Sequence, residues 1–235
     1  MVSLKKSLKN MIAEDKFYYW GLGSTAIILM GLIIPQFGFL GLQDESYSML
    51  NHFVSELGDI VVSEWHMIFN LSLFVGGIFM IPFILGLARY IGTTMAKISA
   101  VIGLICAVGC SLVGVYPMNY LLPHTIVSMT FFIGSIFLTI AMIITIFLQK
   151  EQKIPKWPTA VGIAALTFLG LFFSVDMSAM EGHFSGELNE MFAEFDRPAF
   201  LDIAFYEWGV VLGVLIFIAI IAIIVFKQDY RARTE

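Results

Sequence analysis

The sequence predicts an all-α protein that crosses a membrane six times. Hydrophobic residues make up 59% of the 235-residue chain and charged residues only 13%, with a mean hydropathy of +0.88. Soluble domains carry about 25% charged residues, so this composition indicates a bilayer environment. The apolar residues also form continuous runs, whereas a transmembrane β-barrel would need short segments of alternating polarity.

Six apolar runs are long enough to cross the hydrocarbon core, which takes about 20 residues of helix. They cover residues 17–41, 65–88, 97–116, 125–148, 157–175 and 207–226. The first run follows several lysines, as the apolar part of a signal peptide does, but it is too long and has no small-residue cleavage site. We therefore expect it to be the first membrane-spanning helix, and residues 1–235 to form a single six-helix transmembrane domain.

Charged residues outside the runs are sorted by side. Twelve of the 13 Lys and Arg residues lie on the side that holds both termini, and Arg197 is the only basic residue on the opposite side. By the positive-inside rule, this predicts a multi-pass protein of the cell membrane with both termini cytoplasmic. The outer side holds 13 of the 18 acidic residues and all four histidines. The basic residues suit anionic lipid headgroups and form no nucleic-acid signature.

A polar stripe leads into the second run, with its members three or four residues apart. Read as a helix, this spacing puts them on one side over about five turns. The members are His52, Glu56, Asp59, Ser63, His66 and Asn70. Gly58 and the β-branched residues 60–62 disfavour a helix there, and the alternative is a separate interfacial helix over residues 46–57.

The fourth run opens with a second polar pair. His124 and Ser128 are four residues apart and share one helical face. The preceding connection, residues 117–123, is short, so the third and fourth helices should be antiparallel neighbours. His124 then lies at a depth similar to that of His66, which predicts an outward-facing His/Glu/Asn pocket lined in part by Asn70 and Ser128.

The outer loop 176–206 contains a further helical pattern. Its apolar residues follow an i, i+3, i+4, i+7 spacing, with glutamates on the other face and Pro198 as a stop. The apolar members are Leu188, Met191, Phe192 and Phe195. We expect a short amphipathic helix before the last span, packed on the protein as a lid.

Three short motifs resemble a known family. They are HFVSELGD at residues 52–59, FN at 69–70 and GVYPMNYLLPH at 114–124. Together they are similar to the bacterial and archaeal membrane proteins called domain of unknown function 998. This resemblance implies a six-helix bundle, and the family has no established activity. The matching positions are Ser55, Glu56, Leu57, Gly58, Asn70, Gly114, Pro117 and His124. A more distant similarity is to eukaryotic Frag/autophagy-modulator-like proteins, which are lipid-linked.

The preferred functional interpretation is a lipid-interacting or accessory (scaffold) subunit. Its partners would be membrane lipids and other membrane subunits, and its polar stripe would hydrogen-bond helix ends and interfacial water. One alternative is a transporter with an acidic vestibule at Glu56, Asp59 and Asp176, but the centres of the runs hold almost no ionisable residues.

A second alternative is a metal-dependent hydrolase or lipid-modifying enzyme with an outer site. Zinc is bound by His and carboxylate side chains, and the outer side offers His52, His66, His124, His183 and Asp59. Glu56 or Ser55 would then transfer protons. The chain has no H-E-x-x-H motif, so the ligands would come from separate helices.

A third alternative is a haem-binding protein. His66 and His124 would be the axial ligands between neighbouring helices.

Overall fold

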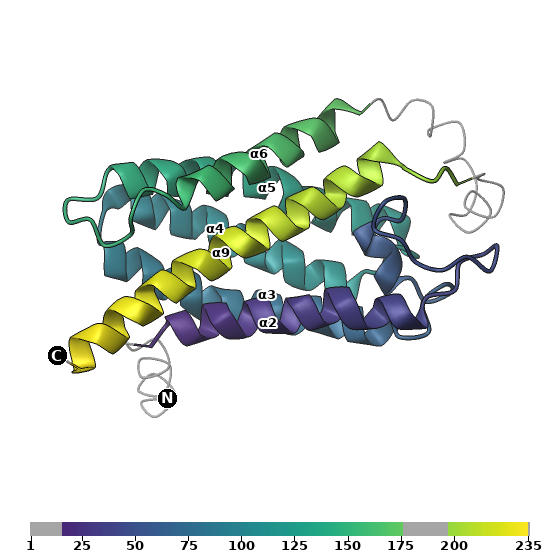
Figure 1. Ribbon diagram of the computed structural model, residues 1–235, viewed down its shortest axis with the longest axis horizontal. Coiled ribbons are helices and arrows are strands. Elements are labelled where there is room, and N and C mark those ends of the chain that lie inside the picture. The colour runs from purple at the N-terminus through teal and green to yellow at the C-terminus, as the bar shows by residue number, and fades with distance from the viewer. Residues whose placement is uncertain (1–15, 176–196, 235) are drawn as a thin grey trace.

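The computed structural model describes residues 16–175 and 197–234, and all of its regular elements are helices (Figure 1). The α-helices are α2 (Tyr18–Ile33), α3 (His66–Ile91), α4 (Thr94–Val115), α5 (Leu121–Phe147), α6 (Thr159–Ser174) and α9 (Asp202–Thr234). Two short 3-10 helices, η1 (Ile34–Gly38) and η2 (Val54–Gly58), lie between α2 and α3. In these ranges the only β-type pairing is an isolated bridge between Phe39 and Ser63.

The helices have the length and composition of membrane-spanning segments. Five are long and apolar enough to cross a bilayer, with η1 extending α2, and α6 is a shorter apolar helix of 16 residues. The prediction of an all-α, polytopic membrane protein is confirmed. The last helix is longer than its apolar run, at 33 residues, and it lies diagonally across the bundle (Figure 1).

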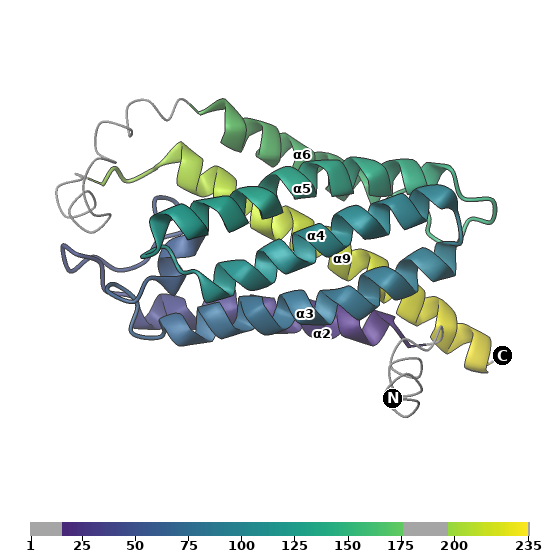
Figure 2. The same cartoon turned by 180° about the vertical axis from the view of Figure 1, so that it is seen from behind.

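The six helices form a closed ring. Helices that follow each other in the chain pack together from α2 to α9, and α9 then packs against α2; Figure 2 shows α3, α4 and α5 side by side. Small residues permit this packing, because a Cβ on Gly114 would clash with the main chain of Asn70 and one on Gly77 with Ser111. A ring of helices leaves an interior that side chains must fill or leave open.

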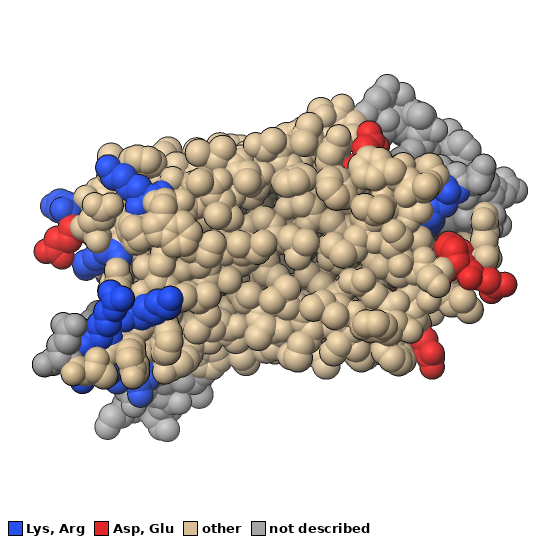
Figure 3. Space-filling model, in the orientation of Figure 1, with Lys and Arg blue, Asp and Glu red and all other residues tan. Residues whose placement is uncertain are grey.

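Charged side chains lie at the two ends of the helix bundle, where the helices of the ring begin and end (Figure 3). We call the end formed by residues 39–66, 116–124 and 197–207 the acidic end, and the end formed by residues 89–97, 147–159 and 226–234 the basic end. The first and last described helices meet at the basic end, where the Tyr18 hydroxyl donates to Asp229 at 2.5 Å. The structure therefore separates the charges as predicted, whereas the side of the membrane on which each end lies stays a prediction.

The segment between η1 and α3 is not the continuous helix that the polar spacing predicts. Only Val54–Gly58 is helical, as a 3-10 helix, so an interfacial helix over residues 46–57 is also wrong. The Asp59 carboxylate accepts from the Val61 N–H at 2.7 Å and forms a turn. Main-chain hydrogen bonds then join residues 62–64 to residues 38–40, so these groups are not available to a helix. The amphipathic helix predicted within 176–206 falls largely on residues 176–196, outside the described residues.

Candidate functional site

The predicted stripe residues are buried at the acidic end, although they do not share one helix. The loop between η1 and α3 folds over the end of the ring and brings five of them inside: His52, Glu56, Asp59, Ser63 and Asn70. His66, at the start of α3, is only partly buried. Its Nδ1 lies 2.9 Å from the Ser63 carbonyl oxygen. Tertiary folding, rather than helical periodicity, is what gathers these residues.

Arg197 is the centre of this buried network. Its guanidinium donates to both oxygens of Glu56, at 3.1 and 2.9 Å, and to the carbonyl oxygen of Asn51 at 2.7 Å. Its Nε lies 3.8 Å from the Glu45 carboxylate. This two-pronged geometry is the strongest form of an arginine–carboxylate pair. The sequence singled out Arg197 as the one base on the acidic side, and that isolation was the signal of its role.

Burial changes the protonation of the groups around Arg197. It raises the pKa of the Glu56 carboxyl from 4.5 to about 7, against the opposing effect of the Arg197 guanidinium and of the Phe53 N–H, which donates to it at 2.8 Å. Burial, followed by the charge of Arg197, lowers the pKa of His52 from 6.5 to about 4. At neutral pH, His52 is therefore uncharged.

The residues of the three sequence motifs in η2, α3 and α4 pack against one another. Asn70 Nδ2 donates to the Gly58 carbonyl oxygen at 3.0 Å, and a Cβ on Gly58 would clash with Asn70 Oδ1. Gly114 of α4 closes on the other side of Asn70. Asp59 accepts from Asn119 Nδ2 at 3.0 Å. These contacts fasten η2 to α3 and to the turn between α4 and α5.

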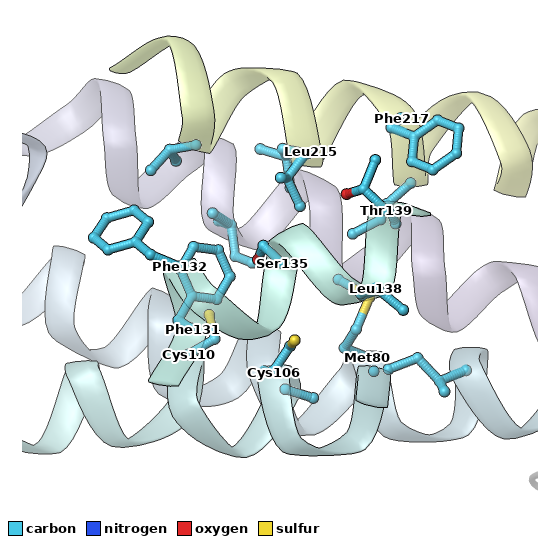
Figure 4. Close-up of a pocket in the computed structure, with 18 of the residues that line it drawn as sticks. Met80, Cys106, Cys110, Phe131, Phe132, Ser135, Leu138, Thr139, Leu215 and Phe217 are labelled. Carbon is cyan, nitrogen blue, oxygen red and sulfur yellow. The ribbon is translucent and has the colours of Figure 1, made fainter. Parts of the chain in front are cut away.

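A long cavity runs inside the ring between α3, α4, α5 and α9 (Figure 4). Its lining extends from Phe69 to Ile91 on α3 and from Glu207 to Ile221 on α9, which is roughly 20–33 Å at about 1.5 Å per residue. The positions that the centre of a water molecule can occupy add up to about 140 Å³. The cavity is therefore long and narrow.

The cavity wall is apolar along most of its length and polar at the acidic end. Side chains such as Met80, Phe132 and Leu215 converge on its middle, where Ser135 and Thr139 are the labelled hydroxyls (Figure 4). At the acidic end the lining includes four polar residues: Ser55, His124, Ser128 and Glu207. The cavity wall is thus apolar over most of its length and polar at one end, which matches the two parts of an amphiphile.

Glu207 is a site residue that sequence reasoning missed. It lies in the second turn of α9, is 6% exposed, and accepts from the Val54 N–H of η2 at 2.7 Å. In the sequence it is one of the outer acids, at the start of the last apolar run. Its position at the edge of an apolar run was the only sign of a possible role. The neighbouring sequence does not indicate that its side chain faces the interior of the ring.

A family model described as "Protein of unknown function (DUF998)" matches residues 27–224. The chain belongs to this family. The match includes η2, Asn70, Gly114 and His124, so the buried contacts at the acidic end lie within the DUF998 region. No curated protein and no solved structure matches the chain.

The predicted histidine pocket is only partly reproduced in this DUF998 protein. His124 and Ser128 line the cavity, whereas His66 and Asn70 are not among its lining residues. His124 Nδ1 lies 2.8 Å from the Tyr116 carbonyl oxygen and so caps the end of α4. The haem hypothesis needs His66 and His124 to face one space, and the cavity contains only the second of them.

The four predicted metal ligands that the structure describes, His52, Asp59, His66 and His124, do not form a metal-binding group. Within residues 16–175 and 197–234, no three His, Cys, Asp or Glu side chains form a group that could hold a metal ion. His183 lies outside the described residues, so a zinc site that includes it, and the proton-transfer roles of Glu56 and Ser55, stay predictions. In the structure Glu56 is engaged by Arg197, and Ser55 Oγ lies 3.6 Å from Met118 Sδ.

Proposed function

We propose that this protein binds a membrane amphiphile, with an alkyl chain in the ring cavity and the polar group at the acidic end. The cavity carries the proposal, because its wall is apolar over the bundle and polar at one end. Pockets for small molecules are typically apolar with a few polar groups that fix orientation. This develops the lipid-interacting interpretation of the sequence and needs no catalytic group.

The dimensions support a single chain. The lipid chains of one leaflet span about half of the ~30 Å hydrocarbon core, and the lining extends over roughly 20–33 Å of helix. A volume of about 140 Å³ for water centres, spread over that length, describes a channel about as wide as one alkyl chain. A fused ring system such as a sterol would need a wider space.

The proposal includes an orientation. With both termini cytoplasmic, as the basic residues predict, the acidic end faces outward and the polar group of the ligand lies near the outer leaflet. A binding protein of this kind suits an accessory subunit that presents or senses a lipid, since most of the described residues lie in the apolar helices.

Photocrosslinking tests the proposal. The purified protein in detergent is irradiated with hexadecanol that carries a diazirine in its chain, and the labelled residues are mapped by mass spectrometry. We expect labels on the lining of α3, α4, α5 and α9. Replacement Thr139→Phe, at a cavity-lining residue that is 2% exposed, should block the channel and reduce the labelling several-fold.

The control for this experiment lies on the same helix. Thr130 is exposed and its hydroxyl donates to its own helix, so Thr130→Phe adds the same bulk on the outer face of α5. It should leave the labelling unchanged. Labels confined to the outer surface of the ring, or equal labelling of the two variants, would show that the cavity is not the binding site.

A further inference from the structure

The hydroxyl groups at the polar end of the cavity have committed their protons to the protein. Ser128 Oγ donates to the Thr125 carbonyl oxygen at 3.2 Å, and Ser55 Oγ donates to Met118 Sδ at 3.6 Å. A hydroxyl has one proton and two lone pairs. Both serines therefore offer the cavity an acceptor.

His124 follows the same pattern. Its Nδ1 faces the Tyr116 carbonyl oxygen at 2.8 Å, and a carbonyl oxygen can only accept, so the proton lies on Nδ1. In the neutral imidazole the other nitrogen, Nε2, is then an acceptor. Because His124 is 8% exposed and lines the cavity, the ring adds a third acceptor to the polar end.

Glu207 adds a buried carboxyl group with no cation beside it. Its carboxylate accepts from the Val54 N–H, but none of the ion pairs among the described residues includes it. The one arginine of the acidic end is bound to Glu56 and lies near Glu45. A buried carboxylate without a counter-charge is costly, so this position is completed by a proton or by a cation.

The surroundings of the cavity end favour a cation. Acidic side chains dominate this end of the molecule (Figure 3), because residues 39–66, 116–124 and 197–207 contain seven acids against a single arginine. A surface of one sign raises the local concentration of the opposite ion. Both the lining and its surroundings thus select hydrogen-bond donors and positive charge.

From these contacts we infer that the amphiphile is a long-chain amine, whose ammonium group donates to Glu207, His124 and one of the two serine hydroxyls. A primary ammonium carries three donors and no acceptor, and an alkylamine with a pKa near that of lysine, about 10.4, is protonated at neutral pH. A fatty acid would place a second carboxyl group against that of Glu207. This inference rests on the proposed function and specifies the chemical class of its ligand.

Competition between three ligands of equal chain length tests the inference. Hexadecylamine, hexadecanol and hexadecanoate each displace the photoreactive hexadecanol from the full-length protein at pH 7.5, with Thr139→Phe as the blank for partition into detergent. A hydrogen bond to a charged group contributes about 1.5–3 kcal/mol, so we expect the amine to compete about tenfold or more better than the alcohol. Hexadecanoate should be the weakest.

The variant Glu207→Gln tests whether Glu207 is the group that favours the amine over the alcohol. It keeps the shape of the side chain and removes its charge, so we expect the amine to lose about tenfold in competition while the alcohol changes little. The matched control is Glu64→Gln, because Glu64 is an exposed acid at the same end and is not a lining residue. It should preserve the preference for the amine.

Two results would overturn the inference. Equal competition by amine and alcohol in the unmodified protein removes it, even if Glu207→Gln does not fold, and leaves the proposed alkyl-chain site intact. An amine preference that survives in folded Glu207→Gln removes the role of Glu207. If the photoreactive hexadecanol does not label the cavity at all, the proposed function fails first.

Discussion

Two arginine–carboxylate pairs lie at opposite ends of the molecule and differ in almost every physical respect. At the acidic end, Arg197 binds Glu56 at 2.9 Å with the two side chains 10% and 4% exposed. At the basic end, Arg233 binds Asp229 at 3.0 Å, one helical turn away, with the side chains 50% and 23% exposed. The first pair joins residues 141 positions apart, and the second lies within α9.

The difference shows that the surroundings, not the chemical type of a pair, decide what it contributes. Water screens the Arg233 pair, and exposed i, i+4 pairs contribute only a few tenths of a kcal/mol. Around Arg197 the solvent is replaced by protein, so removing one partner leaves a buried charge or polar group unmatched. The acidic end is therefore more sensitive to the loss of its arginine than the basic end is.

The largest expected effect is that of Arg197→Ala. Breaking a buried ion pair by removing one partner costs about 3–5 kcal/mol, and Arg197 also holds the Asn51 carbonyl oxygen. Unfolding in detergent can be followed with a thiol-reactive dye, because the two cysteines of the chain, Cys106 and Cys110, lie inside α4 and are largely covered. The apparent melting temperature should fall steeply.

Arg197→Lys is the matched variant for this prediction. A lysine keeps the charge but not the paired donors of a guanidinium, so it should recover only part of the lost stability. Full stability of Arg197→Ala would mean that the acidic end is held by its other contacts.

The next effect is a pH dependence to which Glu56 and His52 contribute with opposite signs. The raised pKa of Glu56 makes stability fall as pH rises from 4.5 to about 7, whereas the lowered pKa of His52 makes it rise between about 4 and 6.5. The two effects overlap and oppose each other. His52→Gln removes the second effect, so its stability relative to the unmodified protein should decline as pH rises from 4 to 6.5, by up to about 3 kcal/mol.

The complementary variant reverses the slope. Glu56→Gln removes the falling contribution, so its stability relative to the unmodified protein should increase as pH rises from 4.5 to 7. Melting temperatures measured across this range, with both variants in the same detergent, check the two signs. Parallel slopes in the two variants would contradict the assignment of these groups.

Loss of an uncharged hydrogen bond at the acidic end should have an intermediate effect on stability. Asn70→Leu keeps the approximate size of the side chain but leaves the Gly58 carbonyl oxygen without its donor. An unsatisfied buried polar group costs about 1–3 kcal/mol. Melting by the same dye method should place this variant between Arg197→Ala and the unmodified protein, and an unchanged melting temperature would show that another donor reaches Gly58.

The smallest effect is expected at the basic end. Arg233→Ala removes an exposed pair within one helix, and the change in stability should not exceed about 0.5 kcal/mol. A melting temperature that falls as far as that of Arg197→Ala would contradict the comparison between the two ends.

The sequence was sufficient for the fold because long apolar runs and sorted lysines and arginines have few other physical explanations. It was insufficient for the acidic end, where intervals of three and four residues predicted a helix. Asp59 forms a turn instead, and residues 62–64 pair with residues 38–40. Local spacing describes a helix only when the main chain has no better hydrogen-bond partners.

The candidate site was predictable only where its residues act locally. His124 and Ser128 line the cavity as a helical pair should, whereas Arg197 and Glu207 acquire their roles from contacts with η2, more than 140 positions earlier. Burial is a property of the assembled ring. No single stretch of sequence contains the information that Glu207 faces the cavity.

The contacts of Arg197 and Glu207 with η2 join residues far apart in the sequence, so they can form only late in synthesis. Val54 and Glu56 leave the ribosome first, and their partners Glu207 and Arg197 are made only with the final segment. Until then, Glu56 has no guanidinium and the cavity has no α9 wall. The arrival of the last helix therefore closes both structures at once, and a chain stopped after α6 would present quality-control proteases with an unpaired acid and an open apolar channel.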